Sequence, residues 1–456
     1  MNSLMRRLVF LLLGFFLFCS AQADPKQVEF ARKPGSSWSR ELTRTLADLP
    51  AIPLDTDLGT FGGLSTSRPK ATGFFHTAKV GDRWWMVDPE GLPFVVRGMA
   101  SVREVKTEGG KKARQELFGS SEEWAIETIQ LFQQNGFNGL GPWSDEKQLK
   151  PKERGMSYVK LWNFMAAYGK KRGGTSQGSG HHEYPGNCPF IFDPEFPIFC
   201  ERYAERLEKT KDDPWLLGHF TDNELPWNIE MLDRYLNLPK GDPGYEAARN
   251  WVAENKVKQP FKKEDRAKFL AYAVDRYFEI VCGAIRKVDP NHLVMGARFH
   301  GRALRELELF SASGAHLDVI SVNYYHVWTP EQERLKTWSE KAGKPILITE
   351  WYAKAEDSGM GNTSGAGWLV KTQEDRGRFY EHFTLGLLES KVCLGWHWFR
   401  YSDNDPEQKG VDPSNLDANK GIVSNRYQRY QPLLYSMNSV NRRAYGIVSY
   451  FDQQSQ

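Results

Sequence analysis

The chain has 456 residues, of which 40% are hydrophobic and 26% charged, a composition typical of a globular protein with one large domain or two ordinary ones. Its 60 basic and 57 acidic residues leave a net charge of +3, which argues against a nucleic-acid partner, because such surfaces need clustered lysine and arginine. Aromatic residues make up 13% of the chain and include 15 tryptophans, and tryptophan is a flat platform for apolar faces of sugars as well as a core residue.

The N-terminus has the pattern of a secretory signal. Basic residues precede an apolar run at 8–18, and small residues suited to cleavage end at Ala23. The run is shorter than a membrane-spanning helix needs, so we expect residues 1–23 to be removed and the protein to be secreted or periplasmic, without integral membrane association. Acylation of Cys19, as in an outer-membrane lipoprotein, is less favoured because Phe18 stands where a small residue is expected.

The next segment, residues 24–73, is rich in Pro, Gly, Ser and Thr and predicts an irregular arm packed on the main body, with one helix-like patch at 40–48. A β-hairpin is predicted at 74–87, because two runs of β-favouring residues flank the turn 80–83. The hairpin opens the main body, which we assign to residues 74–456.

Short apolar strands then alternate with longer helical patterns, which is typical of βα units and a parallel sheet. Eight strands are predicted, at 94–98, 136–140, 158–162, 216–223, 293–299, 318–324, 345–351 and 393–399. The helices between them are predicted at 122–135, 195–211, 263–288, 330–342 and 373–390. Eight such units predict an α/β fold, a (β/α)8 TIM barrel with a short N-terminal arm and hairpin and with inserted βα loops. A doubly wound sheet is the alternative, but no Gly-x-Gly-x-x-Gly motif follows any strand.

Two insertions interrupt this pattern, at 163–192 after the third strand and at 358–368 after the seventh. Both are rich in glycine, and both follow strand ends, where barrel enzymes keep their active sites.

Two acidic residues close predicted strands. Glu224 closes the fourth strand, and Glu350 closes the seventh directly after Ile-Leu-Ile-Thr. A carboxylate in such apolar company is costly to bury unless it is paired or takes part in chemistry. A structural salt bridge explains either residue alone, but the two together at strand ends favour a catalytic pair.

An Asn-Glu pair after strand four and a lone Glu after strand seven resemble the clan A glycoside hydrolases, retaining enzymes built on a TIM barrel. The resemblance implies that Glu224 is the acid/base and Glu350 the nucleophile, with Asn223 on the sugar 2-hydroxyl. A retaining glycosidase needs one protonated carboxyl for the leaving oxygen and one ionised carboxylate for the anomeric carbon. The pKa values of the two groups must therefore be driven apart by their environments.

Other residues at predicted strand ends are candidates for substrate binding. Tyr324 ends strand six and could orient Glu350, and its neighbours Tyr325 and His326 are equally reachable because strand residues alternate faces. Trp396 and Trp398 share one face of strand eight, so one of them could form a sugar platform, although a core position is the commoner fate of a tryptophan. The full set of predicted substrate-binding residues is Asn223, Tyr324, His326, His300, Trp143, Trp351, Trp396 and Trp398.

Three longer phrases, at 82–91, 135–145 and 395–405, resemble the β-agarases of glycoside hydrolase family 50. That family cleaves β-1,4 bonds of agarose and releases short neoagaro-oligosaccharides, often from a chain end. The resemblance implies a polysaccharide or oligosaccharide substrate. The chain departs from the family's pattern at its N-terminus, where members usually carry a sizeable β-sandwich carbohydrate-binding domain. A β-galactosidase or β-mannanase of the same clan, or a non-catalytic carbohydrate-binding barrel, remains as an alternative.

Neither a metal nor a cofactor is expected. His181-His182-Glu183 contains possible ligands, but it lacks the His-Glu-x-x-His spacing of helical zinc sites, so a loop or a substrate contact is the preferred interpretation. Cys188 and Cys200 share a loop-rich stretch and have even odds of forming a disulfide, whereas Cys282 and Cys393 are expected to be buried thiols. The sequence carries no indication of oligomeric state.

Overall fold

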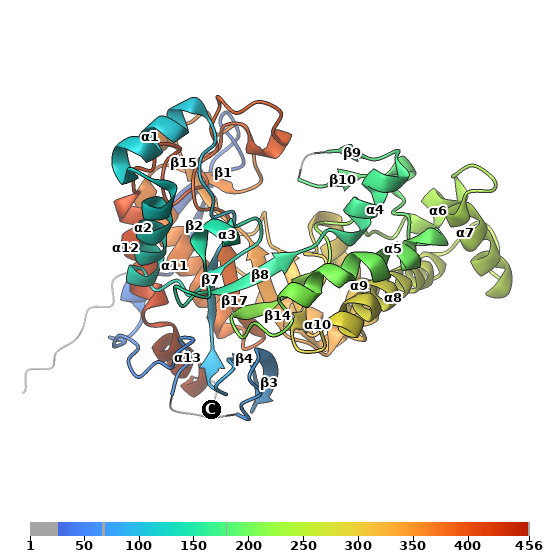
Figure 1. Ribbon diagram of the computed structural model, residues 1–456, viewed down its shortest axis with the longest axis horizontal. Helices are drawn as coiled ribbons and strands as arrows, with labels where there is room; N and C mark the ends of the chain where they lie inside the picture. The colour runs from blue at the N-terminus through green and yellow to red at the C-terminus, as the bar shows by residue number, and fades with distance from the viewer. Residues whose placement is uncertain (1–25, 66–68, 179, 455–456) are drawn as a thin grey trace, which may run out of the picture.

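The computed structural model describes residues 26–65, 69–178 and 180–454 (Figure 1). The predicted signal at 1–23 and Cys19 lie outside the described residues. Within them, no helix combines the length and the apolar character needed to cross a bilayer.

The centre of the molecule is a sheet of eight parallel strands in the order β12-β11-β8-β7-β6-β17-β14-β13. In chain order these strands are β6 (Val96–Met99), β7 (Gly139–Leu140), β8 (Ser157–Leu161), β11 (Leu216–Phe220), β12 (Leu293–Val294), β13 (Ile320–Asn323), β14 (Ile346–Glu350) and β17 (Cys393–Trp398). All eight predicted strands are present, and the predicted parallel α/β sheet is confirmed. Main-chain contacts also join the segments of the two outer strands: the amide of Asp318 donates to the carbonyl of Val294 at 2.9 Å, and Phe299 forms a parallel bridge with Val322.

Helices cover the sheet, with α2, α11 and α12 on one side in Figure 1 and α5, α8, α9 and α10 on the other. Their bounds are α2 Ser121–Gln134, α5 Glu195–Ala204, α8 Lys263–Val288, α9 Leu307–Gly314, α10 Gln332–Ala342, α11 Gln373–Glu389 and α12 Gln431–Asn441. The longest, α8, has the predicted bounds. Its apolar stripe, which includes Phe269 and Phe278, is fully buried, and acidic residues begin it while basic residues end it, as the helix dipole favours.

The arm differs from the prediction of an irregular segment. Strands β1 (Lys26–Ala31) and β2 (Ser39–Thr43) join β15 (Ala353–Ala355) and β16 (Trp368–Val370) in a four-stranded sheet of order β15-β16-β1-β2. The predicted helix-like patch at 40–48 is wrong, because its first residues pair with β1 and only a 3₁₀ turn at Leu46–Asp48 follows. Strand β16 offers its edge to β1, and Phe30 stacks on Trp328 at 4.3 Å between ring centroids.

The predicted hairpin is confirmed as β3 (His76–Val80) and β4 (Arg83–Val87), which pair antiparallel, and β5 (Pro93–Phe94) adds to β4. The insertion after β8 contains α4 (Phe164–Arg172) and a small hairpin of β9 (Ser176–Gln177) and β10 (His182–Glu183). The remaining α-helices are α1 Glu108–Phe118, α3 Glu146–Leu149, α6 Met231–Leu236, α7 Pro243–Glu254 and α13 Ala444–Gln453.

The four cysteines of the described chain, Cys188, Cys200, Cys282 and Cys393, are all buried free thiols. The disulfide between Cys188 and Cys200, which the sequence left open, is not formed in this structure. Burial raises the pKa of Cys188 to about 12, which leaves its thiol protonated and unreactive.

Candidate active site

A cavity of about 700 Å³ opens at the carboxyl ends of the parallel strands, and both predicted catalytic carboxyls line it. Glu224 follows β11, and Glu350 is the last residue of β14. The two side chains come together because the ends of parallel strands meet at one edge of the sheet. Both residues are nearly buried, with 8% of Glu224 and 6% of Glu350 exposed, so the interactions of each carboxyl decide its charge state.

Both oxygens of Glu350 are held by hydrogen-bond donors. Its Oε1 accepts a hydrogen bond from Nη2 of Arg298 at 2.7 Å, and its Oε2 accepts one from the hydroxyl of Tyr325 at 2.8 Å. A guanidinium in contact with a buried carboxylate compensates the charge that burial would otherwise penalise. The two bonds fix both oxygens and therefore the orientation of the carboxylate plane.

Arg298 connects this carboxylate to the end of strand four. It lies beyond β12 with φ of 52°, is fully buried, and donates from Nη1 to Oδ1 of Asn223 at 2.8 Å. Its Cζ lies 4.4 Å from the ring centroid of Trp143, a stacking contact that guanidinium groups favour. One arginine thus positions Glu350, Asn223 and Trp143 together.

Glu224 is held in a different environment. Its Oε1 accepts from Nδ2 of Asn323 at 2.7 Å, and Oδ1 of that amide accepts from the Thr349 hydroxyl, which settles the amide's orientation. Burial raises the pKa of Glu224 to about 7; the nearby His300 lowers the pKa and the charge of Glu350 raises it. At neutral pH a large share of Glu224 is therefore protonated.

The cavity thus places a carboxyl in contact with a buried guanidinium beside a carboxyl whose pKa is raised, a contrast of environments that suits a nucleophile and an acid. Three predicted binding residues line the cavity with them: Asn223, His300 and Trp143. Nδ1 of His300 lies 3.7 Å from Oε1 of Glu224, and Nδ2 of Asn223 donates to the carbonyl of Gly180 at 3.1 Å. Gly180 is in the insertion after β8, and a Cβ added there would lie only 3.2 Å from Oε2 of Glu224.

The prediction that Tyr324 orients Glu350 is wrong. The Tyr324 ring is buried away from the cavity and its hydroxyl donates to Oε2 of Glu331 at 3.0 Å. The next residue, Tyr325, makes the contact instead, because neighbouring residues at a strand end point to opposite faces. His326 is exposed and is not among the residues that line the cavity; its ring lies 6.3 Å from that of Trp368.

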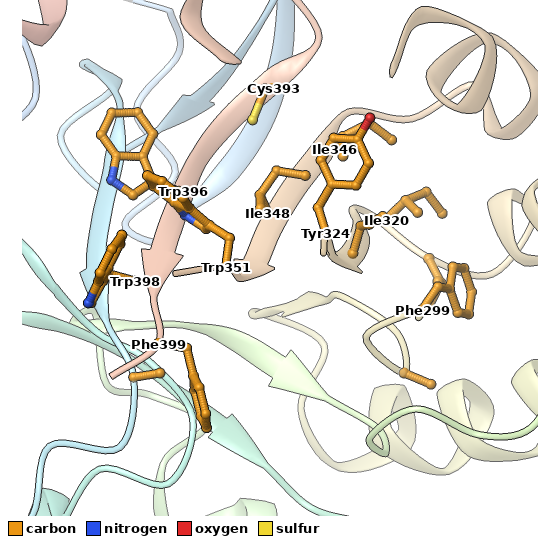
Figure 2. Close-up of a cluster of buried hydrophobic side chains, with 14 of the residues drawn as sticks. Phe299, Ile320, Tyr324, Ile346, Ile348, Trp351, Cys393, Trp396, Trp398 and Phe399 are labelled. Carbon is orange, nitrogen blue, oxygen red and sulfur yellow. The ribbon is translucent and has the colours of Figure 1, made fainter. Parts of the chain in front are cut away.

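Three of the four tryptophans predicted to bind substrate lie in the hydrophobic core (Figure 2). Trp351, Trp396 and Trp398 are at most 1% exposed and do not line the cavity. The shared face of Trp396 and Trp398 is directed toward α11, where the indole of Trp396 donates to the Tyr380 hydroxyl at 2.8 Å. Trp351 stacks on Phe383 of the same helix, with 4.3 Å between ring centroids. All three tryptophans therefore lie outside the cavity for the same reason: they are on the outward face of the sheet, which α11 covers.

Several cavity residues were not predicted as site residues because they come from loops far apart in sequence. They are Ser101, Arg103, His181, Tyr184, Tyr325, Tyr352, Phe399, Arg400, Asp412 and Lys420. Tyr325 was considered as an alternative to Tyr324, and His181 as part of the His-His-Glu phrase. Tyr184 lies in the predicted insertion at 163–192, and Phe399 and Arg400 lie in the phrase 395–405, but none of these three was singled out.

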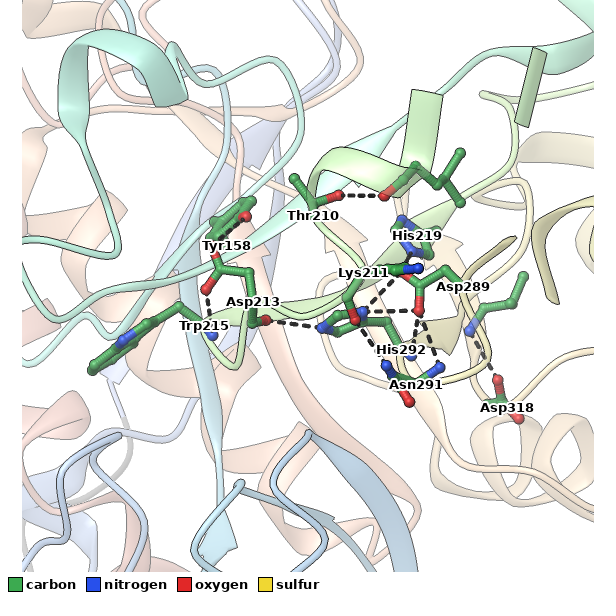
Figure 3. Close-up of polar contacts among 12 residues, drawn as sticks. Tyr158, Thr210, Lys211, Asp213, Trp215, His219, Asp289, Asn291, His292 and Asp318 are labelled. Atoms are coloured by element: carbon green, nitrogen blue, oxygen red, sulfur yellow. Dashed lines mark hydrogen bonds and ion pairs between the residues drawn. The ribbon is translucent and has the colours of Figure 1, made fainter. Parts of the chain in front are cut away.

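A buried cluster elsewhere in the described chain brings together potential metal ligands, His219, Asp289 and His292 (Figure 3). Nδ1 of His219 accepts from the indole of Trp162 at 3.0 Å, so Nε2 carries the proton and donates to Asp289 at 2.9 Å. Burial raises the pKa of Asp289, but the hydrogen bonds from His219 and His292 outweigh it and hold the pKa below its ordinary value. The Nε2 atom of His219 that faces the cluster is thus a donor, and the cluster is a hydrogen-bonded network of the core.

Comparisons with known proteins agree with a glycosidase site. No family model matches the chain. Beta-agarase B of Vibrio sp. (strain JT0107) is 24% identical over 533 residues, covering 91% of this chain and 54% of that protein. Beta-agarase A of the same strain is 27% identical over 380 residues, covering 72% of this chain and 36% of that protein. The chain thus spans about half the length, or less, of these curated relatives.

Solved structures extend the comparison. The agarase AgWH50C shares the fold, with a TM-score of 0.71 and 22% identity over 86% of this chain and 67% of that one. The crystal structure of BpGH50 superposes with a TM-score of 0.83 and 30% identity, and the match covers 94% of this chain and 96% of that one. With this identity over nearly the whole of both chains, the protein belongs to glycoside hydrolase family 50.

Proposed function

We propose that this protein is a retaining glycoside hydrolase that cleaves β-glycosidic bonds of an agarose-like galactan or its oligosaccharides. The observation that carries the proposal is the contrast between two carboxyls in one cavity: Glu350 held by Arg298 and Tyr325, and Glu224 with a raised pKa. Membership of family 50 and similarity to two β-agarases support the galactan substrate.

In the first step Glu350 attacks the anomeric carbon while Glu224 gives its proton to the leaving oxygen, and a covalent glycosyl-enzyme forms. In the second step Glu224, now ionised, takes a proton from water, which attacks the anomeric carbon and releases Glu350. Arg298 and Tyr325 hold the attacking carboxylate in place in the free enzyme. Their donors also stabilise Glu350 as the leaving group in the second step.

Asn223 is the proposed partner of the sugar 2-hydroxyl. Its Oδ1 is committed to Arg298, whereas its Nδ2 faces the Gly180 carbonyl and lines the cavity. A substrate hydroxyl would replace the carbonyl of Gly180 as the acceptor. Trp143 and Phe399, which meet edge to face at 5.9 Å and line the cavity, are the proposed apolar surfaces for the sugar rings.

We further propose that the eight-stranded sheet closes as a (β/α)8 barrel within residues 74–456, with 24–73 as its arm. The contacts between Asp318 and Val294 and between Phe299 and Val322 support this closure. Export of the protein, with removal of residues 1–23, is part of the same proposal, since a polysaccharide substrate is outside the cell.

The test is product analysis with agarose, porphyran, carrageenan and mannan, using the wild type and the variants Glu224→Gln and Glu350→Gln. We expect a galactan to be cut with retention of anomeric configuration, and each variant to lose most activity while remaining folded. Azide should rescue a Glu350→Gly variant with formation of an α-glycosyl azide. Wild-type turnover by either glutamine variant, inversion of configuration, or binding of galactans without hydrolysis would overturn the proposal.

A further inference from the structure

One side of the cavity is lined by three cationic side chains, Arg103, Arg400 and Lys420. Arg103 follows β6, Arg400 follows β17, and Lys420 is in the long loop before α12. Burial, with the neighbouring charge of Arg103, lowers the pKa of Arg400 to about 9, and burial lowers that of Lys420 to about 7. The fold thus holds three basic groups near one another at the active site, where burial and mutual repulsion disfavour their charged forms.

Among the described residues, neither Arg103 nor Arg400 is in direct contact with a carboxylate, although the charge of Asp403 raises the pKa of Arg400 from a distance. In the described parts of the chain, the side chains of Arg103 and Arg400 make no hydrogen bond or ion pair. Arg400 is only 9% exposed, so water cannot readily reach its Nε, which is buried without a partner. Other buried arginines differ, because their guanidinium groups have partners even where Nε does not: Arg376 donates to two carbonyls and a glutamine, and Arg298 to a carboxylate, an amide and a carbonyl. A buried guanidinium left unpaired is rare, because its desolvation is not repaid.

The nearby acidic groups are committed elsewhere. Asp412 lines the cavity, but its oxygens accept from the amide of Gly180 at 2.7 Å and from the amide and hydroxyl of Ser414. Asp403 accepts from Tyr430, Asn419 and the amide of Gly421. Glu350 already has Arg298 at 2.7 Å, so the two unpaired arginines are not needed to hold the nucleophile.

We propose that Arg103 and Arg400 bind an anionic substituent, a sulfate ester or a carboxylate, on the sugar that occupies the cavity. The preferred substrate is then an anionic galactan and not neutral agarose. A planar guanidinium pairs with two oxygens of such a group, and the neutral hydroxyls of agarose would leave both charges uncompensated. Lys420 lines the same cavity, but its ammonium group already donates to the Ser414 carbonyl and to Asn415. This inference rests on the proposed function and specifies its substrate class.

Binding tests the inference apart from catalysis. The enzyme used is Glu224→Gln at pH 6, because it removes the proton donor while keeping Glu350 and its partners intact. Calorimetry compares porphyran oligosaccharides with the same oligosaccharides after chemical desulfation, and with neutral galactan oligosaccharides oxidised at C6 to a carboxylate. We expect one anionic form to bind at least tenfold more tightly than its neutral match, with a preference that shrinks as salt rises. Comparing the sulfated with the C6-carboxylated oligosaccharides shows which of the two anionic groups the site binds. Equal or tighter binding of the neutral forms, or no binding of any form, would overturn the inference.

Substitutions of the two arginines test whether these side chains cause the preference for anionic over neutral oligosaccharides. Arg103→Gln and Arg400→Gln, each added to Glu224→Gln, should lower the anionic-to-neutral affinity ratio at least tenfold. Arg202→Gln, at an exposed position on α5, is the matched control and should leave the ratio unchanged. Arg400→Gln removes an unpaired buried charge, so we expect it to fold, and Arg103→Gln gives a second, independent test. A ratio that survives in both variants contradicts the inference.

The two proposals fail in different ways. If the wild type cuts neutral and anionic galactans with equal kcat/KM, the galactanase function stands and the anionic subsite falls. If the wild type cuts no galactan but the Glu224→Gln enzyme still prefers an anionic one, the subsite stands and the catalytic proposal falls.

Discussion

Replacing Glu224 by glutamine should change the pH dependence of stability as well as activity. In the folded protein the pKa of Glu224 is raised from its ordinary 4.5 to about 7, chiefly by burial. The unfolded chain therefore ionises at lower pH than the folded one. A raised carboxyl pKa means that stability is greatest below the unfolded pKa and is lost as the pH rises toward the folded pKa.

The size of this change in stability follows from the difference between the folded and unfolded pKa values of Glu224. Between two and three pKa units correspond to about 3 kcal/mol, most of which develops between pH 5 and pH 8. Glutamine does not titrate, and its Oε1 can still accept from Nδ2 of Asn323, so the packing around the site is retained. The stability of Glu224→Gln relative to wild type should accordingly rise by about 2–3 kcal/mol between these two pH values.

Urea unfolding at pH 5 and pH 8, followed by tryptophan fluorescence, measures this difference. Glu153→Gln is the control, because the Glu153 side chain is 70% exposed and its removal should change stability equally at both pH values. Parallel behaviour of Glu224→Gln and wild type across the range would refute the argument that burial keeps Glu224 protonated.

Three further outcomes are expected. The wild-type kcat/KM should fall as the pH rises through about 7, because Glu224 loses the proton it donates; a pH–rate profile that stays level to pH 9 would contradict this. Tyr325→Phe should lower kcat/KM by about 10- to 100-fold, since it removes a hydrogen bond to the Glu350 carboxylate, whereas Tyr324→Phe, one residue away, should have a much smaller effect in the same steady-state assay. Asp289→Asn should destabilise the fold by about 3–5 kcal/mol in urea unfolding, because it removes the charge on which two buried histidines converge; a loss below 1 kcal/mol would refute that role.

Local patterns were enough to place the eight strands of the central sheet, the hairpin before them and the main helices between them. The eight strands follow from short apolar runs bounded by turns, and the bounds of α8 follow from its apolar periodicity. The positions of Glu224 and Glu350 were also accessible, because carboxylates directly after apolar strands are costly to bury without a purpose. These features depend on a residue's near neighbours in sequence, and the sequence carries them directly.

The tertiary structure decided which face each side chain occupies. It placed Trp396 and Trp398 against Tyr380 of α11 and left Trp143 in the cavity, and it gave the contact with Glu350 to Tyr325 in place of Tyr324. A one-residue change of face reverses the role of a side chain, and which face a helix will cover is not encoded locally.

The arm shows the same limit for backbone pairing. Strands β1 and β2 form because β16, more than 300 residues away in sequence, presents an edge with which β1 pairs through Phe30 and Val370. The unpaired arginines of the cavity likewise come from loops after β6 and β17 that meet only in the folded protein. The sequence by itself therefore determined the strands of the central sheet and the two carboxyls at their ends. The fold decided the strands of the arm and what surrounds the carboxyls, because edges, faces and charge clusters exist only once distant segments are packed together.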